Sequence, residues 1–566
     1  MPATPTSAPE PAAGAVARSV ATMRRSDWNW AGFVLLGSAL LFLLSNSVWY
    51  GDAMVYTADI RSGQLVEPGH LVWRPLGYVA AALIGVLHSN SDVLWVLQWC
   101  TLLFSALAVA ALWLFLRRRA GCGRMAAGAA AALMAVSNGF WTWSFSGSSY
   151  SLSVLLLIVA MGFATCQERP VSAVGALLAG AFAGAAASSW ATQVLSLPAV
   201  TLLLVLTPPW KRSLWRLHVR NACAMAGGWM LTFPLPLLAA YTWHAHQTHY
   251  GQLQGAAGLG PWLALASHGI PAHLSPAQLL RVMIGWPQSI LSMFDLGQRL
   301  RLWSLHERGF PWSVWMLTPL IVYALAAYCA YRLLKNFRGR SHFEQGLIIA
   351  SVVAIAANLP FALLWQGTDL ERYFPSLPFQ LLLLALALQQ PADARRATAV
   401  LVIALGFIAW INWHAAFLRG LSSHSYRQVW LSQLRRVATG RDLVVVLGQS
   451  KSAIVAPHDP QMPKIDNLTI EIVDRGAGWK AAELRNIEAT LQHGGRVFLG
   501  DSLFGSDSAP RDGWSFKEFP SPSPEEIQSV FLPFKSDTVA FTAGGERVWL
   551  AKQSGRSEAI DETPRL

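Results

Sequence analysis

Long apolar stretches separated by short polar ones fill the first three quarters of the chain. About 20 apolar residues are enough to carry a helix across a lipid bilayer. Apolar stretches, some shorter than this, occupy residues 30–49, 93–116, 125–136, 152–165, 171–187, 194–206, 223–243, 312–331, 347–365, 374–388 and 397–413. The pattern predicts an α-helical polytopic membrane protein with about 11 transmembrane helices.

One more apolar stretch, residues 76–87, is expected not to cross the membrane. At about 12 residues it is too short to span, so it is predicted to be re-entrant or interfacial. With residues 93–116 as the second span, Arg117, Arg118 and Arg119 fall on the cytoplasmic side, as the positive-inside rule requires. The same rule places the N-terminus in the cytoplasm.

This alternation divides the chain into three parts. Residues 1–27 are rich in Ala, Pro, Thr and Ser and are expected to form a disordered cytoplasmic leader. Residues 28–418 form the transmembrane domain. The outer face then carries residues 50–78, 137–151, 244–311 and 366–376, together with the C-terminal tail. Long loops gathered on one face are expected where a site opens outward between helices.

The composition changes near residue 419, and residues 419–566 are expected to form a small C-terminal α/β extracytoplasmic domain. Strands are predicted at residues 442–448, 468–473 and 496–504, a helix at 479–492, and a hairpin around 544–545. Ser523 is predicted to cap another helix, because Pro524 and Glu526 follow it at the first and third helical positions.

The overall charge balance agrees with a membrane protein. Only 13% of the residues are charged and 53% are hydrophobic, with a net charge of +12. The basic residues fall in short clusters between apolar stretches, which indicates orientation in a membrane rather than binding of nucleic acid. The five cysteines avoid the predicted outer loops and tail, so neither a disulfide framework nor a zinc site is expected.

The outer segment after the first span concentrates titratable side chains. Asp52 follows Gly51, whose backbone freedom allows a tight turn that aims the carboxylate back at a groove. Asp52 is the candidate catalytic base for an acceptor hydroxyl, with Asp59 as a second carboxylate. A solvated surface role for Asp52, and an ion pair of Asp59 with Arg61 or Arg74, are the alternatives.

Arginines on the predicted outer side are candidates for binding a donor phosphate. Arg372 precedes a returning span, and a guanidinium there can hold a phosphate through two parallel hydrogen bonds. The alternative is an ion pair of Arg372 with Glu371 or Asp369. Arg61 and Arg74 are further phosphate-binding candidates.

Four ring-bearing residues are candidates for contacting substrate: His70, Trp141, Tyr150 and Tyr373. The aromatic residues of the 140–150 loop could wall a lipid or sugar, or could anchor the protein at the membrane interface. A separate cluster of histidines at positions 244, 246 and 249 makes a divalent metal possible, although no residue is assigned as a ligand.

Several of these features together resemble the glycosyltransferase C superfamily, and within it the protein O-mannosyltransferase-like and aminoarabinose-transferase-like members. The resemblance covers residues 30–415. It rests on Gly51-Asp52 after the first span, the 70–87 segment, the arginines at 117–119, the Phe140-Trp141 to Tyr150-Ser151-Leu152 stretch, and Glu371-Arg372-Tyr373-Phe374-Pro375. Related sequences often have an acidic residue just before the tyrosine matched by Tyr150, where this chain has Gly147-Ser148-Ser149.

The resemblance implies a sugar transfer from a polyprenyl-phosphate donor at the outer membrane face. Asp52 would be the catalytic carboxylate, and Arg372 would lie near the donor phosphate. The acceptor would be an extracytoplasmic glycan, lipid or protein. Composition favours a bacterial inner membrane, with the tail in the periplasm. A transporter or flippase of lipid-linked glycans, or a non-enzymatic scaffold whose tail binds a partner, remain the alternatives.

Overall fold

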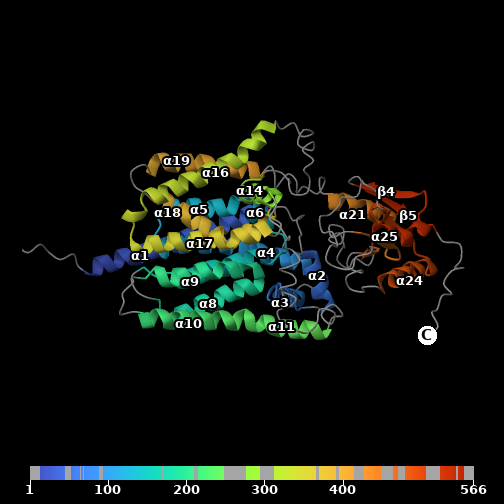
Figure 1. The fold of residues 1–566 in the computed structure, drawn as a ribbon, viewed down its shortest axis with the longest axis horizontal. Helices are drawn as coiled ribbons and strands as arrows, with labels where there is room; N and C mark the ends of the chain where they lie inside the picture. Colours follow the sequence, from blue (N-terminus) through green and yellow to red (C-terminus); the bar gives the residue numbers. More distant parts are fainter. Residues whose placement is uncertain are drawn as a thin grey trace, which may run out of the picture.

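The first three quarters of the chain fold into a bundle of helices (Figure 1). The computed structural model describes residues 13–44, 53–63, 65–67, 69–87, 93–167, 171–208, 215–247, 276–292, 312–364, 367, 369–389, 394–413, 426–447, 463–468, 478–504, 523–543 and 546–552. The helices before residue 250 are α1 Ala13–Leu43, α2 Ala53–Ser62, α3 Trp73–Leu87, α4 Val93–Arg118, α5 Arg124–Val136, α6 Asn138–Trp143, α7 Tyr150–Ala164, α8 Ala173–Ser189, η1 Ala191–Ser196, α9 Leu197–Leu206, α10 Trp215–Thr232 and α11 Pro234–Gln247. After it come α14 Pro276–Ile290, α16 Trp312–Lys335, η3 Phe337–Gly339, α17 His342–Leu364, η4 Leu370–Tyr373, α18 Leu377–Leu388 and α19 Ala394–Asn412.

Every predicted span corresponds to a helix. Three helical segments of the described chain are long and apolar enough to cross a membrane: Val93–Arg118, Trp215–Ala240 and His342–Leu363. The other apolar helices are shorter, among them α5, α7, α8 and α18. The chain is therefore a mostly helical membrane protein, whereas the count of about 11 spans stays a prediction.

The structure has helix in two segments for which no helix was predicted. Residues 13–27, placed in a disordered leader, form the first turns of α1, because the Ala-rich sequence there has high helix propensity. The predicted outer loop 244–311 contains α14, an amphipathic helix too short and too polar to register as a span. Residues 244–247 of that loop also continue α11.

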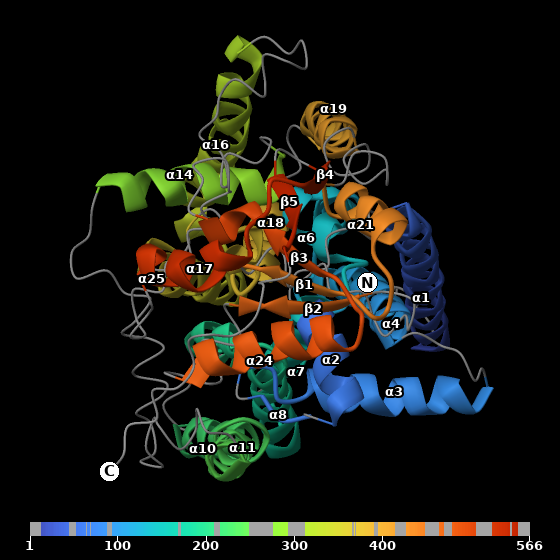
Figure 2. The same ribbon diagram turned by 90° about the vertical axis from the view of Figure 1, so that its right-hand side faces the viewer.

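Two helices lie crosswise to the rest. In Figure 2, which looks along most bundle helices, α3 and α14 run across the view. Both leave apolar side chains exposed at helical spacing: Tyr78, Val79 and Leu83 on α3, and Leu279, Leu280 and Met283 on α14. For α3 this orientation fits the interfacial alternative, since a crosswise amphipathic helix suits the plane of a membrane surface.

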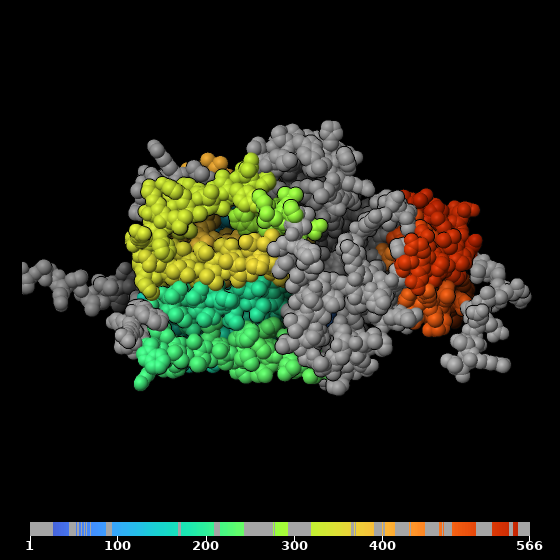
Figure 3. Space-filling model, viewed as in Figure 1, coloured from blue at the N-terminus to red at the C-terminus, as the bar shows by residue number. Residues whose placement is uncertain are grey.

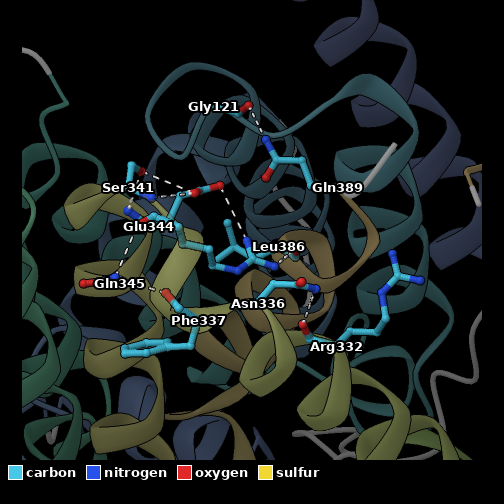
Figure 4. Close-up of polar contacts among 10 residues, drawn as sticks. Gly121, Arg332, Asn336, Phe337, Ser341, Glu344, Gln345, Leu386 and Gln389 are labelled. Carbon is cyan, nitrogen blue, oxygen red and sulfur yellow. Dashed lines mark hydrogen bonds and ion pairs between the residues drawn. The ribbon is translucent and has the colours of Figure 1, made fainter. Parts of the chain in front are cut away.

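The polar loops gather at the two ends of the bundle as the predicted topology requires. At the end predicted to be cytoplasmic, Gln389 donates to the carbonyl of Gly121 at 2.8 Å (Figure 4). In the same cluster, Arg340 pairs with Glu344 at 3.5 Å and donates to the Leu386 carbonyl at 3.2 Å. These contacts connect loops far apart in the sequence, so the predicted inner loops share one end.

Helices α8 and α10 approach each other closely because glycines line their contact. A Cβ at Gly180 would lie 1.9 Å from the Met225 carbonyl oxygen, and one at Gly228 would lie 2.1 Å from the Leu177 carbonyl oxygen. Small residues of this kind let helix backbones meet in a membrane protein.

Helices α16 and α17 both pack on α18, and Figure 3 shows a recess between them.

The tail forms an α/β unit beyond the end of the bundle where α2 and α6 lie (Figure 1). Its five strands are β1 Leu443–Val446, β2 Lys464–Asn467, β3 Val497–Gly500, β4 Val539–Ala543 and β5 Glu546–Leu550. They form one sheet in the order β2-β1-β3-β5-β4. β1 is parallel to both β2 and β3, whereas β5 is antiparallel to β3 and β4.

Helices cover both faces of this sheet. Val444, Val446 and Phe498 pack with Trp430 of α21 (Tyr426–Val437). The alternate residues of these strands pack on the other face with α24 (Trp479–Gln492) and α25 (Pro524–Phe531). A strand covered on both faces is apolar at successive positions, which explains the continuous LVVV of β1.

The tail confirms most of its sequence predictions. The helix over 479–492 and the β4–β5 hairpin are as expected, and the Ser523 side chain accepts a hydrogen bond from the Glu526 amide at 3.1 Å. Leu468 was predicted to begin a strand over 468–473, and this is wrong. The strand is Lys464–Asn467 and ends before Leu468; its polar residues suit a strand at the edge of the sheet. Residues 469–473 lie outside the described residues. The domain boundary at 419 stays a prediction.

Candidate functional site

Two backbone hydrogen bonds join the segment before α3 to the end of α8 and the residues that follow it. The Val72 amide donates to the Ser188 carbonyl at 3.2 Å, and the Ala191 amide donates to the Gly69 carbonyl at the same distance. Two backbone segments that are more than a hundred residues apart in the chain are therefore hydrogen-bonded to each other. The His70 side chain lies between these two bonds and is fixed with them.

The His70 ring is held at one nitrogen. Its Nδ1 lies 3.0 Å from the Ser189 carbonyl oxygen and 2.8 Å from Ser149 Oγ. Its ring also makes an edge contact with Tyr56 at 5.3 Å and with Tyr150 at 6.4 Å between centroids. The imidazole is therefore oriented from three sides.

Tyr150 is the centre of a cluster of aromatic rings. Trp143 and Trp190 each contact its ring edge-to-face at 5.0 Å, and Phe374 does so at 6.2 Å. Such pairs add about 0.5–1.5 kcal/mol each beyond the area they bury. The rings come from four separate segments, so Tyr150 joins the 140–150 loop to the entry of α18.

Arg74 lies among carboxylates on the buried side of α3. Its Nη2 is 2.6 Å from Asp59 Oδ2 and 3.0 Å from Glu67 Oε2, and its guanidinium lies 5.7 Å from the Tyr56 ring centroid. The ion pair of Asp59 with Arg74, one of the sequence alternatives, is thus present. Two carboxylates around one guanidinium leave this group net negative.

Trp73, next to Arg74, anchors α3 to the 140–150 loop. Its indole Nε1 donates to the Gly147 carbonyl at 3.0 Å. Gly147 has φ +88° and a Cβ there would lie 3.0 Å from Ala53 Cβ, so both its conformation and its space require glycine. The start of α2 therefore packs on this turn.

Arg372 lies at the entry to α18 with its side chain 14% exposed. Its Nη2 is 3.2 Å from Asp369 Oδ2 and 3.7 Å from Glu371 Oε1. Burial by itself would lower the pKa of Arg372, but the charges of Glu371 and Asp369 outweigh it and raise the pKa. Phe374, two residues further along the chain, contacts the Tyr150 ring at 6.2 Å, so the segment that carries Arg372 adjoins the aromatic cluster.

Tyr373 faces away from that cluster and holds α14. Its hydroxyl donates to the Gly367 carbonyl at 2.5 Å and lies 3.5 Å from the Val282 carbonyl oxygen. At Gly285 a Cβ would lie 1.8 Å from the Gly367 oxygen. Burial raises the pKa of Tyr373, with Tyr323 and Asp369 adding to it. Tyr373 therefore positions α14 against η4.

Three more predicted site residues are Asp52, Arg61 and Trp141. Asp52 lies outside the described residues, directly before Ala53 in the chain. Arg61 lies in the last turn of α2. Trp141 is only 1% exposed and packs against Trp413 at 6.0 Å, so the structure does not bring it to Tyr150.

The structure does not identify ligands for the possible metal ion among the described residues. Within the described ranges, no group of three or more His, Cys, Asp or Glu side chains could hold a metal ion. The backbone at positions 244 and 246 belongs to α11 and position 249 lies outside the described residues.

Sequence reasoning missed three members of the cluster. Ser149, Ser189 and Trp190 orient His70 and Tyr150 from loops on the same predicted face. These residues could have been noticed in the sequence, because the polar Ser188-Ser189 pair and Trp190 follow directly on an apolar stretch. Ser149 stands where related sequences often carry an acid, and here its hydroxyl contacts the histidine.

Comparisons with known proteins find similarity in structure alone. No protein-family model matches the sequence, and no curated protein matches it. The structure of ArnT from Cupriavidus metallidurans bound to undecaprenyl phosphate matches with a TM-score of 0.56 at 9% identity, over 92% of this chain and 98% of that chain. The chain therefore shares the overall fold of this ArnT structure.

Two further solved structures are similar over much of their length. ArnT from Cupriavidus metallidurans in the apo state has a TM-score of 0.49 at 12% identity, covering 93% of this chain and 98% of that one. The Archaeoglobus fulgidus oligosaccharyltransferase in the apo form has a TM-score of 0.45 at 13% identity, over 84% of this chain and 70% of that one.

Proposed function

We propose that this protein is an integral membrane glycosyltransferase that moves a sugar from a polyprenyl-phosphate donor to an extracytoplasmic glycan, lipid or protein. The observation that carries the proposal is the fold shared with ArnT bound to undecaprenyl phosphate over 92% of this chain. The second support is chemical: the His70 ring contacts the Tyr150 ring, and Phe374, two residues after Arg372, contacts Tyr150 as well. A scaffold would not require such a cluster.

In the proposed reaction, the bond between the sugar C1 and the phosphate oxygen breaks while a bond forms between C1 and the acceptor oxygen. Asp52 takes the proton of the acceptor hydroxyl, which is worth about 10²–10⁴-fold in rate. Arg372 stays cationic and stabilises the charge that develops on the departing phosphate. Asp59 and Arg74, bound to each other, hold α2 and α3 in place. Arg61 remains a phosphate-binding candidate.

The proposed membrane arrangement follows from the ends of the bundle. The basic end with Arg117 and Arg340 faces the cytoplasm with the N-terminus, and about 11 spans cross the inner membrane. Residues 419–566 form the periplasmic domain. Leu320 on α16 and Val352 on α17 are exposed apolar residues that would face lipid, and Figure 3 shows a recess between these two helices. We place the prenyl chain there, leading toward Arg372.

The test is sugar transfer by membranes supplied with radiolabelled undecaprenyl-phosphate sugar. Asp52→Asn is expected to lower turnover at least about 100-fold without lowering expression. The control is Asp27→Asn, which removes a carboxylate that pairs with Arg117 at the opposite end, 3.4 Å away. Turnover by Asp52→Asn at the wild-type rate would remove Asp52 from the mechanism. Wild-type membranes that translocate the lipid without transferring sugar would favour the flippase.

A further inference from the structure

Two ring nitrogens beside Tyr150 are available to a ligand. His70 contacts the Tyr150 ring at 6.4 Å and Trp143 contacts it at 5.0 Å. Both belong to the end of the bundle that holds Arg372, yet neither is needed for the transfer mechanism above. Trp143 Nε1 has no hydrogen-bond partner among the described residues, and the two hydrogen bonds described for His70 are both at Nδ1.

The bond between His70 and Ser189 fixes which nitrogen of the imidazole is available. A carbonyl oxygen can only accept, so a hydrogen on Nδ1 satisfies the Ser189 oxygen 3.0 Å away, and Ser149 Oγ, 2.8 Å from Nδ1, then accepts from the same hydrogen. In the neutral ring Nε2 is then an acceptor with a lone pair. Because the backbone bonds of Gly69 and Val72 fix the loop, this lone pair has a set direction.

The Trp143 indole offers the opposite function. Its Nε1 is buried and has no hydrogen-bond partner in the described structure. An indole nitrogen can only donate. A buried donor without a partner is costly, and an acceptor group of a ligand beside Tyr150 would satisfy it.

We propose that His70 Nε2 and Trp143 Nε1 form a subsite for the hydroxyl groups of the donor sugar, with Tyr150 between them. One acceptor and one donor match hydroxyl groups, which both donate and accept. A phosphate oxygen would only accept, and its charge suits Arg372 instead. The subsite rests on the proposed function, because the lipid carrier brings the sugar to this end of the bundle.

Two conservative variants separate the subsite from a structural role. His70→Asn keeps an amide N–H that can donate to the Ser189 carbonyl but lacks Nε2. Trp143→Phe keeps an aromatic ring against Tyr150 but lacks the N–H. The matched control is Trp141→Phe on the same helix: its indole nitrogen is also buried without a partner among the described residues, but its ring packs on Trp413.

The measurement is binding to the purified full-length protein of undecaprenyl phosphate, and of undecaprenyl phosphate carrying glucose, mannose or galactose. Wild type should prefer at least one sugar-bearing lipid over the bare lipid by about tenfold. His70→Asn and Trp143→Phe should each lose about two- to tenfold of that preference while binding the bare lipid as before. Trp141→Phe should keep the full preference.

The possible results distinguish failure of the subsite from failure of the proposed function. If wild type binds the bare lipid and none of the three sugars improves binding, the subsite is wrong while the lipid-linked function stands. If the preference falls in Trp141→Phe and survives in the other two variants, the sugar contact lies at Trp141 instead. If no lipid binds, the proposed function fails and the subsite fails with it.

Discussion

Substituting one glycine of α10 tests how the bundle positions the site. A Cβ at Gly228 would lie 2.1 Å from the Leu177 carbonyl oxygen and 2.8 Å from the Ala181 nitrogen, both on α8. The preceding residue, Gly227, has nothing within 4 Å of the same position. Gly228→Ala and Gly227→Ala are therefore a matched pair one residue apart.

The size of the effect follows from these distances. Packed carbon and oxygen atoms approach to about 3.3–3.6 Å, so Gly228→Ala has to push α8 and α10 apart by more than about 1 Å. Overpacking of this kind costs about 1–3 kcal/mol. Gly227→Ala only removes a glycine from a helix, which is favourable by up to about 1 kcal/mol.

The displacement would also reach the site. Ser188 and Ser189 end α8, where the Ser188 hydroxyl donates to the Thr232 carbonyl of α10 and the Ser189 carbonyl accepts from His70. Moving α8 away from α10 therefore moves the carbonyl that orients the histidine. We expect Gly228→Ala to lose sugar transfer as well as stability.

The assay is the half-life of the folded protein in detergent at a fixed temperature, because large membrane proteins unfold irreversibly. Gly228→Ala should shorten it, by up to about tenfold for each 1.4 kcal/mol, while Gly227→Ala should not. Equal half-lives for the two variants would show that the α8–α10 contact is looser than described, and the link from glycine packing to His70 would be refuted.

Two further predictions concern buried polar groups. Burial alone would raise the pKa of Asp442, but hydrogen bonds from Arg496 and Thr439 outweigh it and hold the pKa below its usual value. Stability from this carboxylate is therefore present above pH about 3.9 and lost as the pH falls through the lowered pKa. Amide exchange of β1, corrected for intrinsic rates, should show this acid dependence in wild type and not in Asp442→Asn; identical profiles would contradict it. Asn412 is fully buried and bonds the backbones of Val136, Ile290 and Ser292, so Asn412→Leu should destabilise the bundle by at least about 1–3 kcal/mol, measured as a shorter half-life in detergent. An unchanged half-life would mean that water replaces these bonds.

The sequence by itself determined the parts of this protein that depend on local pattern. Apolar stretches set the positions of the bundle helices, because transfer from water to lipid depends on the side chains of one segment alone. The helix at 479–492, the Ser523 cap and the β4–β5 hairpin followed from short-range rules in the same way. The resemblance to the glycosyltransferase C superfamily added an expected fold, and the structure is similar in fold to ArnT from Cupriavidus metallidurans.

Only the tertiary structure decided which residues meet. His70 lies 119 positions from Ser189 in the chain, and Phe374 is more than 200 from Tyr150, yet His70 meets Ser189 and Tyr150 contacts both His70 and Phe374. Trp141 and Trp143 look alike in sequence but point to different partners, Trp413 and Tyr150. Hydropathy reports whether a segment prefers lipid to water, whereas the neighbours of a side chain depend on how closely helices approach, and here glycines set that approach for α8 and α10.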